Sequence, residues 1–189
     1  LESSRDGDLF RWPISEDQNQ PFSAPDVTAK IKIEIEGTGI SFERPIQFRY
    51  ADSTRGEIRR DLNVVPALSV SVDQKLLVVP QSNKPQTRTL TVGITNNLSR
   101  PMTGIAGLNI TTPDEWKVTA ANRTFDLKKK GEQTSVAFEI TIPAKTKPGS
   151  YNIYANASVG EGLATQTMNT IAYPHIQTHR FYTRAETKV

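Results

Sequence analysis

The sequence has 189 residues, enough for one large or two small domains, and its 23 Lys and Arg against 20 Asp and Glu leave a net charge of only +3. It contains no cysteine, which excludes disulfides and cysteine nucleophiles, and no apolar run near the roughly 20 residues that a membrane helix needs. Val and Ile total 27 against 11 Leu, and this excess of β-branched residues favours strands over helices.

The first predicted domain covers residues 1–66 and opens with an irregular, polar segment over 1–25. Apolar and polar residues alternate from Val27, which places Ile31, Ile33 and Ile35 on one face and predicts a half-buried strand with one wet face. A second strand is expected around 46–50, after a strand end at 37–39, and a third from 58 to Pro66. Three strands are too few for a sandwich, so the missing ones either lie before residue 1 or come from the N-terminal segment. Residue 1 is Leu, and the simplest expectation is a fragment of a longer protein.

The second predicted domain covers residues 67–173 and alternates far more regularly. Strands are predicted over 68–72, 75–79, 90–94, 102–111, 116–118, 125–127, 136–142, 151–159 and a last stretch ending near Tyr173. Eight or nine short strands at this spacing indicate a sandwich or a barrel, and the inward alternation and loop lengths favour two antiparallel sheets packed face to face. The polar tail, 174–189, is predicted to be an extended linker.

Basic residues do not gather on one face, as nucleic-acid binding would require. The densest run, Lys128-Lys129-Lys130, is followed by Gly131 and Glu132 and is predicted to be a solvated hairpin turn. No nucleic-acid partner and no membrane insertion are therefore expected.

Four pieces of sequence carry a family resemblance. They are 45–52 with Arg55-Gly56-Glu57 and 60–66; Asn96, Gly104, Leu108, Pro113 and Trp116-Lys117-Val118 with Phe125 and Lys130-Gly131-Glu132; Gly149-Ser150-Tyr151; and Tyr173-Pro174-His175-Ile176 with Arg180-Phe181-Tyr182. In this order, from residue 46 to 184, they resemble the region downstream of the deacetylase domain in large secreted bacterial PIG-L (LmbE-type) proteins. The middle pieces are similar to an Ig-like accessory domain of bacterial carbohydrate-active enzymes, although Asp114-Glu115 stands where such domains often carry Gly before the Trp.

The resemblance implies tandem Ig-like antiparallel β-sandwiches in an all-β chain, with the first sandwich incomplete. It places a zinc-dependent deacetylase upstream, and the ligand motif of that enzyme, His-Pro-Asp-Asp, does not occur here. The fragment itself is therefore expected to be no enzyme and to need no cofactor. Its expected partners are neighbouring domains of the same chain, in an extracellular or periplasmic bacterial setting.

Candidate chemistry in the residues is sparse. His175 and His179 are the only histidines, and after Pro174 they lie in an extended segment rather than on one helix face, so a zinc site with three protein ligands is not expected. Asp6-Gly7-Asp8 resembles a calcium loop, but Leu9 and Phe10 interrupt it and favour a plain turn. A Ser-His-Asp triad has no suitable histidine, and the carboxylates fall on turns or wet strand faces. No catalytic, cofactor-binding or metal residue is assigned.

The two tryptophans are candidates for sugar stacking. Trp116 alternates with Val118 at a strand start, which favours a core position, and Trp12 is expected to pack against a neighbouring domain. The sequence thus favours a structural accessory module that spaces and buttresses a catalytic domain. The alternative is a carbohydrate-binding module that targets the parent enzyme to a glycan, with an exposed aromatic pair on a sheet face or at the loop ends.

Overall fold

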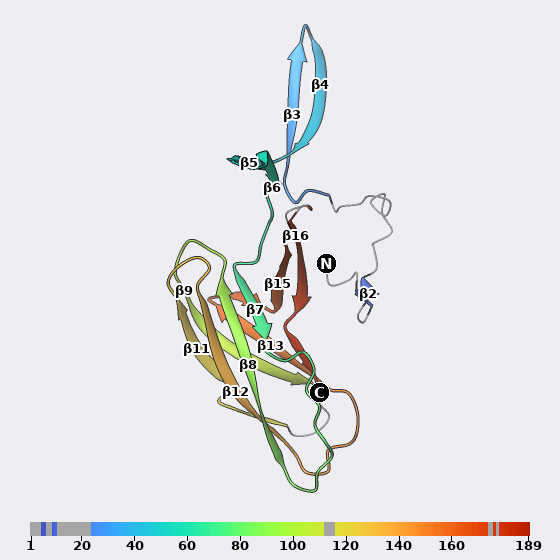
Figure 1. Cartoon of the computed structure of the whole chain (residues 1–189), viewed down its shortest axis with the longest axis vertical. Coiled ribbons are helices and arrows are strands. Elements are labelled where there is room, and N and C mark those ends of the chain that lie inside the picture. Colours follow the sequence, from blue (N-terminus) through green and yellow to red (C-terminus); the bar gives the residue numbers. More distant parts are fainter. Residues whose placement is uncertain (1–4, 7–8, 11–23, 112–115, 174–175, 177) are drawn as a thin grey trace. The chain divides into compact units, whose positions relative to one another are not determined.

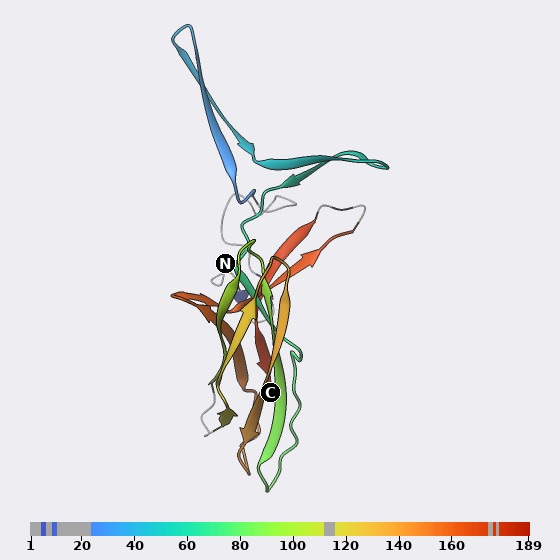
Figure 2. The same ribbon diagram turned by 90° about the vertical axis from the view of Figure 1, so that its left-hand side faces the viewer.

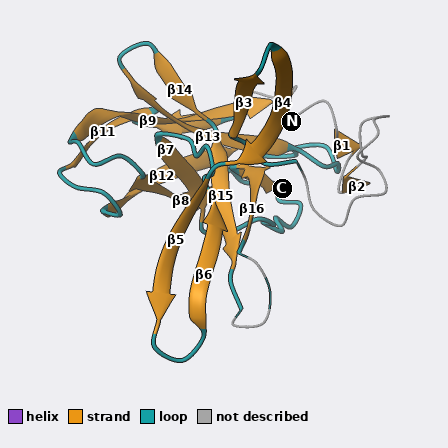
Figure 3. Cartoon of the chain, turned by 90° about the horizontal axis from the view of Figure 1, so that it is seen from above, coloured by secondary structure: helices purple, strands orange, loops and turns teal. Residues whose placement is uncertain are grey.

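The computed structural model of the chain describes residues 5–6, 9–10, 24–111, 116–173, 176 and 178–189, where every regular element is a strand (Figure 3). This confirms the prediction of an all-β fold. The described part of the chain has no helix with the length and apolarity that crossing a membrane requires. The chain divides into two compact units, Leu1–Val64 and Val65–Val189.

The first unit consists of antiparallel strand pairs. They are β1 (Arg5–Asp6) with β2 (Leu9–Phe10), β3 (Thr28–Ile35) with β4 (Thr38–Pro45), and β5 (Gln47–Asp52) with β6 (Gly56–Asp61). Figure 2 shows β3–β4 in blue and β5–β6 in teal as two separate ribbons. The strand β4 was not predicted, because its start was interpreted as the end of β3.

The turn between β3 and β4 explains this hairpin. Glu36 and Gly37 both have positive φ angles, 50° and 78°, which is the conformation of a two-residue type I′ turn. Such a turn matches the twist of two antiparallel strands and directs the chain straight back along β3. In the second hairpin the Asp52 carboxylate accepts hydrogen bonds from the backbone N–H groups of Thr54 and Arg55, both at 3.0 Å, and fixes the turn.

No residue between 24 and 64 is buried. The prediction that the strand after Val27 is half-buried is therefore wrong for the structure, because no second layer of described residues covers it. The exposed large apolar side chains of this stretch are Ile31, Ile33, Ile35, Ile40, Phe42, Ile46, Phe48, Leu62 and Val64.

The second unit is a sandwich of two sheets (Figure 1). One sheet has the order β10-β12-β8-β7, and the other has the order β11-β9-β13-β14 with β17 also paired to β13. The strands are β7 (Leu68–Val72), β8 (Gln86–Asn96), β9 (Met102–Thr111), β10 (Lys117–Thr119), β11 (Asn122–Leu127), β12 (Gln133–Ile142), β13 (Asn152–Val159), β14 (Gly162–Ala164) and β17 (Glu186–Lys188). A separate hairpin joins β15 (Gln166–Ile171) to β16 (His179–Arg184).

The core lies between the two sheets and follows the predicted alternation. Leu90 on β8 is directly opposite Phe138 on β12, and both side chains are fully buried. Further buried side chains from the two sheets are Val70, Val92, Ile94, Ala106, Leu127, Ile140, Ile153 and Ala157. The predicted sandwich is therefore confirmed for this unit.

Two predicted local elements differ from the structure. Residues 75–79 form only an isolated parallel bridge between Leu76 and Lys188 rather than a strand, because this segment crosses over after β7. The run Lys128-Lys129-Lys130 lies between β11 and β12, which belong to opposite sheets, so it is a loop between the sheets and not a hairpin turn. The carboxylate of Glu132 holds this loop by accepting hydrogen bonds from the backbone N–H groups of Lys128 and Lys129.

The described residues of the predicted linker tail, 174–189, are instead part of the sandwich unit from His179 onward. β16 pairs with β15, and β17 pairs with β13, where Ile153 is opposite Thr187. β14 covers only the distal end of β13, at Ala157–Val159, which leaves the other end of that edge open for β17. The small side chains of Ala185 and Thr187 fit there and are buried, so a polar composition did not mean an unpacked segment.

Candidate functional site

The histidines and acids singled out in the sequence do not converge in the described structure. His175, Trp12, Gly7 and Asp8 lie outside the described residues. His179 is on β16, where its ring stacks on Phe181 with 6.2 Å between ring centroids. No group of three His, Asp or Glu side chains occurs among the described residues in a form that could hold a metal ion.

Three carboxylates have pKa values below their ordinary range. A hydrogen bond from the Thr54 side chain is the main cause for Asp52, and a hydrogen bond from the Arg59 side chain for Glu57. For Asp126 the causes are hydrogen bonds from Lys128 and then Thr103. A general acid needs a raised pKa, whereas these shifts keep the carboxylates ionised. The three groups therefore fix turns and cross-strand contacts.

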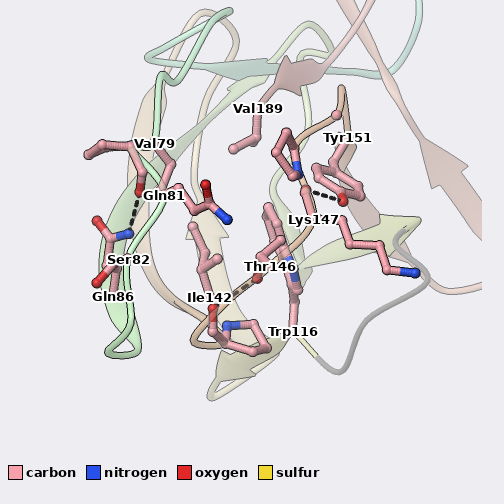
Figure 4. A pocket seen from close by; sticks show the side chains of 14 residues that line it. Val79, Gln81, Ser82, Gln86, Trp116, Ile142, Thr146, Lys147, Tyr151 and Val189 are labelled. Atoms are coloured by element: carbon pink, nitrogen blue, oxygen red, sulfur yellow. Dashed lines mark hydrogen bonds between the residues drawn. The ribbon is translucent and has the colours of Figure 1, made fainter.

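One end of the sandwich contains a pocket of about 210 Å³ (Figure 4). Its walls come from the segment before β8, the start of β10, the loop between β12 and β13, and the C-terminus. The lining residues are Val79, Pro80, Gln81, Ser82, Gln86, Trp116, Ile142, Pro143, Thr146, Lys147, Pro148, Gly149, Tyr151 and Val189. This set contains no Asp, Glu or His, and its titratable side chains are Lys147 and Tyr151.

Trp116 and Tyr151 form the aromatic part of this pocket. Their ring centroids are 5.2 Å apart with the planes tilted by 50°, a favourable arrangement for two aromatic rings. Each residue directly precedes a strand, Trp116 before β10 and Tyr151 before β13. The hydroxyl of Tyr151 donates to the carbonyl oxygen of Lys147 at 2.7 Å and so ties the loop to the strand.

Trp116 is partly buried against the hydrophobic core, which confirms the predicted packing role. Its indole Nε1–H is buried and has no acceptor among the described residues. A buried donor without a partner calls for a water or ligand oxygen, since most such groups in proteins are satisfied. Sequence reasoning found Trp116 but missed Tyr151 as its neighbour, although an aromatic residue immediately before each of two strands was a usable signal.

The polar groups of the pocket are mostly engaged with the surrounding loops. The Gln86 amide donates to the carbonyl of Pro80 at 2.7 Å, and the Thr146 hydroxyl donates to the carbonyl of Pro143 at 2.8 Å. Gln81 and Lys147 are exposed at its margin. The arrangement can hold a small polar molecule against aromatic rings, and it offers no nucleophile with a base beside it.

Comparisons with known proteins find similarity over part of the chain. No curated protein matches the chain. Among solved structures, alpha-2-macroglobulin from Escherichia coli, from domain MG7 to its C-terminus, is 15% identical with a TM-score of 0.39; the match covers 64% of this chain and 16% of that one. A FixG-related protein from Vibrio parahaemolyticus is 13% identical with a TM-score of 0.36, over 66% of this chain and 100% of its own. A member of the MSP family from C. elegans is 11% identical with a TM-score of 0.32, over 48% of this chain and 72% of its own.

A family model adds more than these structures do. Residues 83–160 match the NPCBM-associated, NEW3 domain of alpha-galactosidase. This range contains β8 to β13 and therefore both sheets of the sandwich. The match supports the accessory-domain part of the resemblance seen in the sequence and does not reach a PIG-L parent. The sandwich is thus similar to NEW3, a non-catalytic accessory domain associated with carbohydrate-active enzymes.

Proposed function

We propose that the chain is a non-catalytic accessory module of a multidomain bacterial protein of the PIG-L type, an N-acetylglucosaminyl deacetylase-like enzyme, and that it spaces and buttresses the catalytic domain. The observation that carries the proposal is the likeness of residues 83–160 to NEW3 in a unit whose interior is filled by apolar side chains. The resemblance of the flanking segments supports the PIG-L parent. Because NEW3 domains occur in secreted glycoside hydrolases, we place the parent outside the cytoplasm.

The way the sandwich is closed supports a mechanical role. The last strand, β17, pairs with β13, and the backbone N–H of Leu77 donates to the carbonyl of Lys188 at 2.8 Å. The C-terminal residues are thereby bound on both sides, to one sheet and to the segment that crosses over from the other. A domain fastened in this way transmits the orientation of whatever follows it, as a spacer must.

The test compares the parent enzyme with a variant in which residues 67–189 are replaced by a Gly/Ser linker of equal length. We expect the isolated chain to have no deacetylase activity, and we expect the linker variant to unfold at a lower temperature than the parent. Differential scanning calorimetry and hydrolysis of a soluble acetylated substrate are the measurements. A catalytic domain that is equally stable and active without the module contradicts the proposal.

The pocket favours a second function, in which the module binds a glycan. The Trp116 and Tyr151 side chains are both partly exposed and line the pocket, and their paired rings provide an aromatic surface for a sugar ring. A glycan array identifies the oligosaccharides that the module binds, and isothermal titration calorimetry with those oligosaccharides then tests this idea. Lys147→Ala, at the pocket margin, should weaken binding, whereas Lys84→Ala, an exposed loop lysine that does not line the pocket, should not. An array without hits excludes this second function and leaves the spacer role untouched.

A further inference from the structure

Strand β3 has an unusual order of charges. Along one face it carries Lys30 and Lys32 followed by Glu34, with Glu36 next in the turn, while Ile31, Ile33 and Ile35 occupy the other face. The sequence from 30 to 36 is therefore Lys-Ile-Lys-Ile-Glu-Ile-Glu. When two copies of this segment are aligned in opposite directions, each Lys of one copy is opposite a Glu of the other. Two antiparallel strands are aligned in this way.

The charges in the middle of β3 are not paired within the hairpin. Lys30 reaches Glu43 on β4 at 3.5 Å, but Lys32 is opposite Ser41, and Glu34 is opposite Gly39. Neither Lys32 nor Glu34 makes an ion pair with a described residue, and both are exposed. Opposite charges facing each other across two strands are favourable, so these two side chains have an interaction available that β4 does not supply.

The outer edge of β3 is open. Among the described residues β3 pairs only with β4. The pair Ile35–Thr38 closes the two-residue turn, so the peptide groups of Ile31, Ile33 and Ile35 point to β4. Those of Lys30, Lys32 and Glu34 consequently point outward. A two-stranded hairpin with an exposed apolar face is only marginally stable in water, whereas three or more strands can be stable.

We propose that β3 pairs antiparallel with β3 of a second copy of this chain, about a two-fold axis at Ile33, to form a four-stranded sheet in the order β4-β3-β3-β4. In this register Lys32 of each copy faces Glu34 of the other, and Ile31 faces Ile35. The outward peptide groups of Lys32 and Glu34 meet, so the ladder hydrogen bonds form where donors and acceptors are open. Each contact occurs twice, as an isologous interface requires.

Neighbouring registers are unfavourable, and this fixes the pairing. A shift by one residue would put the isoleucines of one copy on the charged face of the other. A shift by two in either direction keeps the faces but places Lys32 against Lys32, or Glu34 against Glu34. Like charges directly opposite each other destabilise a sheet. The edge of β4 is a weaker candidate, because Gly39 lies near its start, Ser41 near its centre and Pro45 at its end.

Charge reversal at the two positions tests the register. Sedimentation velocity on the full 189-residue chain should show a dimer. Lys32→Glu and Glu34→Lys should each raise the dimer Kd by about tenfold or more, because each creates two like-charge pairs. The double variant should return Kd to within about threefold of the natural chain. An equimolar mixture of the two single variants should form a heterodimer, in which both charged pairs are again opposite. Lys84→Glu, which makes the same change of net charge as Lys32→Glu but in an exposed loop, is the matched control for that variant and should leave Kd unchanged.

A disulfide tests the axis independently of the charges. The chain has no cysteine, so Ile33→Cys introduces a single thiol. At the axis the two Cα atoms would be about 4.5 Å apart, within the range that a disulfide spans. Oxidation should give a covalent dimer rapidly with Ile33→Cys and slowly with the control Ile40→Cys on β4. A chain that stays monomeric up to about 1 mM, single variants that leave Kd unchanged, a mixture that does not associate, or equal cross-linking of the two cysteine variants would each overturn the proposal.

Discussion

Thr187, near the C-terminus, donates a hydrogen bond from its Oγ1 to the backbone carbonyl of Gln74 at 2.6 Å, and its side chain is fully buried. The two residues are 113 positions apart, and the bond joins β17 to the segment that leaves β7. Together with the pairing of β17 to β13, it closes the open side of the sandwich. The last five residues therefore belong to the fold of the unit rather than to a connection beyond it.

Removing this hydrogen bond should destabilise the sandwich without changing its shape. Thr187→Val keeps the volume but leaves the Gln74 carbonyl without its donor, which costs about 1–3 kcal/mol. Urea denaturation followed by the amide NMR signals of β8 and β12 measures the free energy of unfolding. Thr170→Val, on the exposed surface of β15, is the matched control and should change it by less than about 0.5 kcal/mol. Equal effects of the two substitutions would contradict a structural role for the C-terminal strand.

Two phenylalanines distinguish the covered sandwich from the uncovered hairpins. Phe138 on β12 is fully buried, whereas Phe48 on β5 is 63% exposed. Phe138→Ala should cost the second unit about 3–5 kcal/mol, because it leaves a cavity in a packed core. Phe48→Ala should change the stability of the first unit by about 0.5 kcal/mol or less, as at an ordinary surface position. A large loss of stability on Phe48→Ala in the isolated chain would mean that this ring is covered in solution. If that loss of stability then disappears on dilution, the ring is covered by a second copy of the chain.

Gly104 on β9 should not tolerate a side chain. A Cβ atom there would lie 2.1 Å from the backbone oxygen of Ser158 and 2.7 Å from a methyl group of Val159, distances that require the strands to separate. We expect Gly104→Ala to lower the free energy of unfolding by about 1–3 kcal/mol, which is typical of overpacking. In the control Gly149→Ala, the nearest atoms are 3.6 Å away in ordinary contact, and the change should be small. Amide exchange along β13 would locate the strain, and unchanged protection there would contradict overpacking as the cause.

The sandwich was predictable from the sequence because the apolar residues that alternate along its strands are the residues that form its core. Phe138 and Ile140 on β12 and Leu90 and Val92 on β8 follow one another at every second position, and all four are buried. Sustained period-two alternation of this kind is typical of a strand with one covered face. The pattern from Ile31 to Ile35 is equally clear, yet those side chains are exposed. Alternation indicates which face is to be covered, and it does not indicate what covers it.

The tail and the pocket depend on contacts that a local pattern does not encode. Ala185 and Thr187 are small and lie in a polar segment, and their burial follows only from the length of β13 that β14 leaves uncovered. Trp116 and Tyr151 are 35 positions apart, and they meet because β10 and β13 begin at the same end of the sandwich. The strand β4 was missed for a different reason. Gly37 is the residue that a type I′ turn favours at its second position, but Glu36 is not one of the Asn, Asp or Gly residues usual at its first.

The pKa of Asp126 should respond by different amounts to the loss of its two hydrogen-bond donors, Lys128 and Thr103. The hydrogen bonds from Lys128 and, second, from Thr103 hold its pKa below the ordinary value of 3.8. A depressed carboxyl pKa stabilises the folded state at all pH values above the ordinary pKa, and this stabilisation is lost as the pH falls through the lower, folded value. NMR titration of the Asp126 side-chain carboxyl carbon should therefore give a midpoint under 3.8, and Lys128→Met should move it upward more than Thr103→Val does.

The neighbouring lysine provides the control for this titration. Lys129 contacts Glu132 through its backbone N–H at 3.0 Å, so Lys129→Met removes a nearby charge without removing a bond to Asp126. Its effect on the Asp126 midpoint should be smaller than that of Lys128→Met and should disappear at high salt, since exposed charges are screened there. Equal shifts from the two lysine substitutions would mean that the local positive field, rather than the hydrogen bond of Lys128, holds the carboxylate ionised.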